Sequence, residues 1–80
     1  AKVSRKESEI VVDVRDDLRE GIEPFAAIMA ALRDTPPDHA FVLLTTFRPE
    51  PLIALLGDQG FQCDAEELLG GEWRVTFRRA

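Results

Sequence analysis

The chain is poor in the side chains that most enzymes use for chemistry. Its 80 residues contain one cysteine, one histidine and no tyrosine. A single cysteine excludes an internal disulfide, and a lone histidine lacks the ligand spacing of a metal site. Ser4 and Ser8 lie far from His39 along the chain, so no serine–histidine–aspartate set can be assembled. We therefore expect no catalysis by this domain alone, no metal and no cofactor.

Basic residues and long apolar runs are also scarce. Ten lysines and arginines stand against fifteen aspartates and glutamates, which gives a formal net charge of −5. This balance argues against a nucleic-acid partner held by general attraction to phosphate. No apolar run is long enough for a signal peptide or a membrane span. We expect a cytoplasmic protein that binds neither nucleic acid nor membrane, and the oligomeric state stays open.

The apolar pattern predicts four strands and two helices. Residues 1–8 are polar and are expected to form a flexible N-terminal segment, with a single domain over residues 9–80. The charged stretch 16–21 is interpreted as a connection. The predicted elements, in chain order, are a strand over 10–15, a helix over 24–35, a strand over 40–47, a helix over 51–57, a strand over 61–68 and a strand over 73–78.

The first helix carries the clearest periodic signal. Its apolar residues recur at i, i+3, i+4 and i+7, which is the spacing of one buried stripe; they are Phe25, Ile28, Met29 and Leu32. Strand–helix–strand units cross over with a right hand, so both helices are expected on one face of a four-stranded mixed sheet. The predicted fold is thus an α/β (α+β) two-layer sandwich in the order strand, helix, strand, helix, strand, strand.

The other face of this sheet raises a separate possibility. The strand over 40–47 is apolar on both sides, so either the Phe41 set or the Val42 and Leu44 set must point away from the helices. An uncovered apolar stripe invites a partner or a second copy. One hypothesis is therefore a structural interaction domain that docks through the open sheet face.

Five sequence segments carry a family likeness when they are taken together. They are Asp13-Val14-Arg15, Glu23-Pro24-Phe25, Phe47-Arg48-Pro49-Glu50-Pro51-Leu52, Gly60-Phe61 and Gly71-Glu72-Trp73-Arg74-Val75. In this combination the chain resembles the TusA/SirA-like superfamily, and more closely its cysteine-less branch, domain of unknown function family 2249. The likeness covers about residues 10–79.

The resemblance also marks what this chain lacks. Sulfur carriers of the superfamily hold a nucleophilic cysteine in a Cys-Pro-x-Pro motif at the start of the first helix, where the helix dipole lowers its pKa. The matching run here is Gly21-Ile22-Glu23-Pro24, so the sulfur atom is missing. Some members of the cysteine-less branch place His-Asp where this chain has Phe47-Arg48, and phenylalanine cannot bind a metal or haem.

One sheet edge is the best candidate site. Arg15 and Arg48 follow two neighbouring parallel strands, Arg19 lies in the connection between them, and Glu23 precedes the first helix. Ligands of open α/β sheets sit outside the carboxyl ends of the strands, and helix starts attract anions. We expect a non-catalytic binding or regulatory module that recognises a small anion or a protein partner here. The alternative is that nearby carboxylates neutralise these arginines in surface ion pairs.

A further alternative places the chemistry at the remaining thiol. Cys63 alternates with polar residues in the third predicted strand. As the reactive group of a sulfur-relay or thiol-carrier protein it would need an electropositive, open environment. Its acidic neighbours Asp64 and Glu66 are expected to raise the pKa of the thiol and so to lower its reactivity. The other interpretation is that Cys63 serves as a small buried hydrophobic residue.

Overall fold

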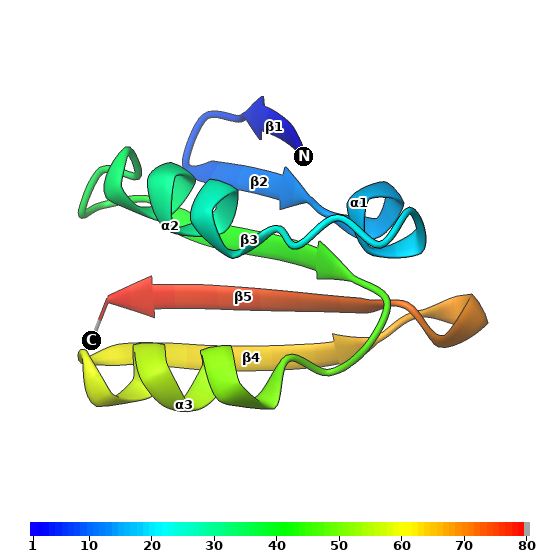
Figure 1. Cartoon of the computed structure of the whole chain (residues 1–80). Coiled ribbons are helices and arrows are strands. Elements are labelled where there is room, and N and C mark those ends of the chain that lie inside the picture. Colours follow the sequence, from blue (N-terminus) through cyan, green and yellow to red (C-terminus); the bar gives the residue numbers. More distant parts are fainter. Residues whose placement is uncertain (80) are drawn as a thin grey trace.

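The computed structural model describes residues 1–79 as one five-stranded mixed sheet with its helices packed beside it (Figure 1). The strand order is β1-β2-β3-β5-β4. The elements in chain order are β1 (Lys2–Arg5), β2 (Glu9–Asp13), α1 (Arg15–Arg19), α2 (Phe25–Arg33), β3 (Ala40–Thr45), α3 (Glu50–Asp58), β4 (Phe61–Glu67), the 3-10 turn η1 (Leu69–Gly71) and β5 (Trp73–Arg79).

The predicted α/β sandwich is confirmed in outline. β2 and β3 pair in parallel, while β3 with β5 and β5 with β4 pair antiparallel, so the sheet is mixed. Figure 1 shows α2 and α3 on the same face of this sheet, with α2 over β2 and β3 and α3 over β4. The carboxyl ends of β2 and β3 therefore meet at the edge from which α1 and the loop to α3 emerge.

The number of strands was predicted wrongly. The fifth strand is β1, which comes from the segment expected to be flexible and pairs antiparallel with β2, with Val3 opposite Val12. All four of its residues are exposed, so no buried side chain marks it in the sequence. β1 forms because the free edge of β2 offers backbone donors and acceptors.

The prediction of an irregular connection over residues 16–21 is also corrected, because most of these residues form the short helix α1. Asp16 and Asp17 in its first turn favour the positive helix start. The helix ends at Gly21, whose φ of 75° is left-handed. The Gly21 N–H bonds the Leu18 carbonyl at 3.2 Å and the Ile22 N–H bonds the Asp17 carbonyl at 2.8 Å. This pair of bonds is a Schellman motif, in which glycine is the preferred residue.

The core lies between the sheet and the two longer helices. Alternate residues of β2, β3 and β5 point into it, and Val12, Phe41, Val75 and Phe77 have no exposed surface. Ile28 and Leu32 of α2 pack on this layer as predicted. Phe25, predicted for the same buried stripe, is half exposed at the first position of α2.

The opposite sheet face is less open than the sequence suggests. Val42 points away from the helices but is only 4% exposed, because Val11 and Thr76 lie beside it in the register. Glu66 and Arg74 lie opposite each other on β4 and β5 and form an ion pair at 2.5 Å. The face thus has a small apolar centre and a charged border.

Candidate functional site

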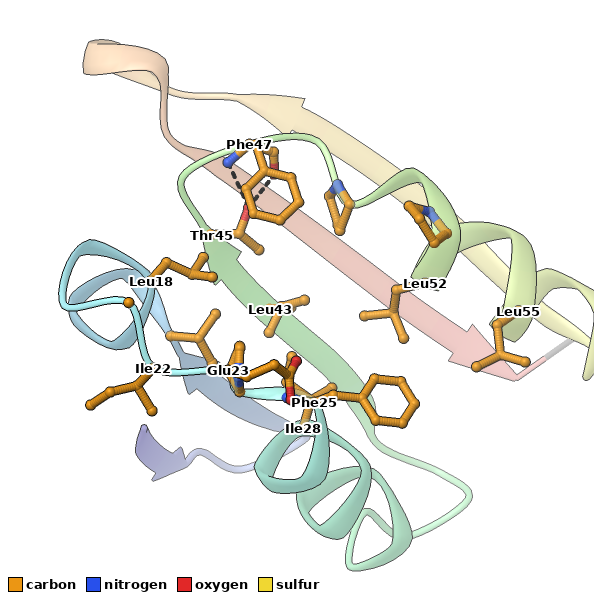
Figure 2. Close-up of a pocket in the computed structure, with 15 residues that line it drawn as sticks. Leu18, Ile22, Glu23, Phe25, Ile28, Leu43, Thr45, Phe47, Leu52 and Leu55 are labelled. Atoms are coloured by element: carbon orange, nitrogen blue, oxygen red, sulfur yellow. Dashed lines mark hydrogen bonds between the residues drawn. The ribbon is translucent and has the colours of Figure 1, made fainter.

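A groove lies between α2 and α3 on the helix-bearing face of the sheet (Figure 2). It has a volume of about 540 Å³ and runs over the middle of β3, where Leu43 forms its floor (Figure 2). One wall comes from Phe25 and Ile28 of α2, and the other from Leu52 and Leu55 of α3. The groove lies between α2, which covers β2 and β3, and α3, which covers β4 (Figure 1).

The rim of this groove is apolar and open to solvent. Ile22 is 53% exposed, Phe25 49%, Phe47 50% and Leu55 38%. Within residues 1–79, these are four of the six large hydrophobic side chains that are exposed. Single exposed apolar residues are ordinary, but a cluster around a hollow is typical of a binding site.

The loop after β3 borders the groove. The buried Thr45 hydroxyl accepts the Phe47 N–H at 3.0 Å and also donates to the Phe47 carbonyl, so this residue is held at both backbone groups. Figure 2 shows these bonds above the groove. Pro49, which is buried, and Pro51 continue the same border into α3. The loop therefore positions the Phe47 ring on the rim.

The segment between α1 and α2 also lines the groove. Gly21 turns the chain, and Ile22 and Glu23 then line the groove. The Glu23 Oε1 atom accepts the Phe25 N–H at 2.9 Å and so caps the start of α2. Among the lining residues Glu23 is the one with a charged side chain, and Thr45 is the other with a polar one.

The three arginines of the predicted site are each paired with a carboxylate. Arg15 donates to both oxygens of Asp13, with its Nε 2.9 Å from Oδ1 and its Nη2 2.7 Å from Oδ2, and its Nη1 donates to Glu72 Oε1 at 2.8 Å. Arg19 also donates to Glu72 and lies 3.4 Å from Asp16. Arg48 lies 3.4 Å from Glu50.

These ion pairs divide the three arginines at this sheet edge into two groups. Glu72 joins Arg15 and Arg19 in one cluster, whereas no hydrogen bond or ion pair within residues 1–79 links Arg48 to either. Hydrogen bonds from Arg19 and Arg15 hold the pKa of Glu72 below its ordinary value, and those from Arg15 do the same for the pKa of Asp13. The guanidinium groups thus already hold anions of the chain itself. Anion binding at Arg15, Arg19, Glu23 and Arg48 stays a prediction.

Glu72 and the groove are the features that sequence reasoning missed. Glu72 follows the two glycines of the β4–β5 turn, and β5 runs antiparallel to β3, so this turn returns to the edge that carries Arg15. The hairpin and the sheet edge were both predicted, and their combination could have indicated Glu72. The groove depends on the spacing of two helices, for which the sequence has no direct signal.

The remaining candidate residues lie away from this groove. Cys63 is half buried on β4 with its Sγ 3.9 Å from the Ile53 carbonyl, and burial raises the pKa of its thiol. His39 Nδ1 lies 2.9 Å from Asp38 Oδ1. Residues 1–79 contain no group of three or more histidine, cysteine, aspartate or glutamate side chains arranged to hold a metal. None of the helices there has the length and hydrophobicity needed to cross a membrane.

The fold and the groove together define a small α/β module with an apolar site at the helix-bearing face. The chain belongs to the family described as an uncharacterised conserved protein, DUF2249, whose model matches residues 11–79. This match confirms the family of unknown function that the sequence was expected to belong to. No match was found among curated proteins or among solved structures.

Proposed function

We propose that this domain is a non-catalytic binding module whose site is the apolar groove between α2 and α3. The observation that carries the proposal is the coincidence of a cavity of about 540 Å³ with a rim of exposed apolar side chains. Pockets for small organic ligands have volumes of roughly 300–1,000 Å³ and are lined mainly by apolar and aromatic groups. The occupant proposed is therefore a small, largely apolar molecule.

This proposal keeps the location expected from the sequence and changes the chemistry. The groove opens at the edge where α2 and α3 begin, and Glu23 belongs to both the predicted site and the groove. An anionic ligand is less well supported, because Arg15, Arg19 and Arg48 have carboxylate partners. A more distant relation to the TusA/SirA-like sulfur carriers is part of the same proposal, with the groove in place of the thiol as the functional feature.

The test compares two leucines with the same substitution. Leu55 lines the groove, whereas Leu69 lies in the β4–β5 turn and is 96% exposed. We expect the neutral dye Nile red to bind the protein with increased fluorescence. Leu55→Gln should weaken this binding roughly tenfold, since burying a leucine-sized contact contributes on the order of 1.5–3 kcal/mol. Leu69→Gln should leave it unchanged.

Two results would contradict the proposal. One is the absence of saturable dye binding to the folded protein. The other is an equal loss of affinity in both variants, which would indicate non-specific contact with exposed leucines. Urea unfolding of each variant checks that the comparison is made between folded proteins. Sedimentation without dye detects a second copy of the chain in the groove, which would also count against a small-molecule ligand.

A further inference from the structure

The charges around the groove are not balanced. Arg15 and Arg19 pair with Asp13, Asp16 and Glu72, and Arg48 pairs with Glu50. Glu20 and Glu23 have no ion-pair partner within residues 1–79, and the whole chain carries a net charge of −5. The unpaired charge at the groove mouth is therefore negative.

Glu23 is the carboxylate that faces this space. It is exposed, it lines the groove, and one of its oxygens is fixed by the Phe25 N–H at 2.9 Å. Its second oxygen, Oε2, has no hydrogen bond from any residue in the range 1–79. Figure 2 shows the carboxylate beside Phe25, on the groove side of the start of α2. The site thus offers one oriented acceptor and no free cation among the described residues that line it.

Two aromatic rings also line the groove. Phe25 and Phe47 are both half exposed. The face of an aromatic ring attracts a cation. Apart from Glu23, the lining side chains carry a single polar group, the hydroxyl of Thr45, and this hydroxyl is occupied by the backbone of Phe47.

On these grounds we propose that the ligand is an organic cation, with an apolar alkyl or aromatic body and one ammonium group. This inference rests on the proposed function of the groove. The body lies over Leu43 between the two helices, and the ammonium group donates to Glu23 Oε2 at the mouth. A ligand with several polar groups is disfavoured, because the groove has no further partners for them.

The experiment uses three probes of equal chain length: octylammonium, octan-1-ol and octanoate. Their binding to the isotope-labelled protein is followed from the amide signals of Ile22, Phe25, Leu43 and Leu55. We expect octylammonium to bind about fivefold more tightly than octanol, with octanoate weakest, a difference of the size that an exposed ion pair supports. The preference should shrink with added salt, which screens exposed charges.

The matched variants are Glu23→Gln and Glu20→Gln, which change the net charge equally. The glutamine introduced by Glu23→Gln retains an amide oxygen that can accept the Phe25 N–H, so the start of α2 is kept. We expect Glu23→Gln to abolish the preference for octylammonium while octanol binds as before. Glu20 does not line the groove, and Glu20→Gln should preserve most of the preference.

The outcomes separate this inference from the proposed function. If octanol shifts the groove signals but octylammonium binds no better, the cation is wrong and the apolar site stands. If the preference survives Glu23→Gln, the pairing of the ammonium group with Glu23 is wrong and the inference fails, while the apolar site again stands. If no probe shifts these signals, both proposals fail. Shifts that depend on protein concentration without any probe assign the groove to a second copy of the chain and likewise overturn the inference.

Discussion

The glycine at position 21 permits a test that separates backbone conformation from side-chain contact. Gly21 ends α1 with a φ of 75°, whereas Gly57 lies in the last turn of α3 with an ordinary helical conformation. A Cβ atom added at either position would meet nothing within 4 Å. Replacing each by alanine therefore changes only the cost of holding the backbone in its native conformation.

The two substitutions should change the free energy of unfolding in opposite directions. A left-handed conformation costs an L-residue roughly 1–2 kcal/mol, and the lower entropy of the unfolded alanine chain offsets about 0.4–1 kcal/mol of this. Gly21→Ala should therefore lower the free energy of unfolding by about 1 kcal/mol. Gly57→Ala should raise it by about 0.5 kcal/mol, since alanine is the better helix former and the position lies near a helix end.

Urea and thermal unfolding measure both effects, with Trp73 fluorescence and circular dichroism as two independent signals. For a domain of this size, 1 kcal/mol corresponds to a shift of roughly 4–8 °C in Tm. Gly21→Ala should melt below the parent protein and Gly57→Ala above it. An unchanged or raised Tm for Gly21→Ala would refute the assignment of Gly21 as the left-handed end of α1. Equal shifts in the same direction would refute the whole comparison.

Two further predictions concern titration. The lowered pKa values of Asp13 and Glu72 mean that their contribution to stability is complete above the ordinary values of 3.8 and 4.5 and is lost as the pH falls through the lower folded-state values. Glu72→Gln should flatten this acid dependence in urea unfolding as the pH falls below about 4.5. At about pH 8, Cys63 should react more slowly with a thiol reagent than free cysteine does, because burial raises its pKa. A faster reaction would revive the thiol-carrier hypothesis.

Most of the fold could be predicted because its main elements have strong local signals. β3 has a continuous apolar run, and α2 has apolar residues at i, i+3 and i+4. Both patterns are visible in the sequence because they reflect the burial of these elements in the core. β1 and α1 lack such signals. β1 has no buried residue, and α1 has only five residues, of which Leu18 alone is a hydrophobic side chain packed against the core. Both are stabilised by the edge to which they attach rather than by their own sequence.

The sheet edge that carries the candidate site residues could be predicted from the sequence, but the pairing of its arginines could not. The order of strands and helices places Arg15, Arg48 and the two helix starts at one edge, and the structure has them there. Whether an arginine is available to a ligand depends on which carboxylates reach it. Glu72 pairs with Arg15, which lies 57 residues earlier in the sequence, and a local sequence pattern cannot predict a contact between residues so far apart.

The position of Gly21 links the resemblance to the proposed site. In the sulfur carriers that the sequence resembles, the reactive cysteine stands just before the first helix, and here the corresponding glycine lines the apolar groove. The left-handed conformation of Gly21 lets α1 end so that Ile22 and Glu23 reach the rim. The turn at Gly21 therefore forms part of the wall of the proposed binding site.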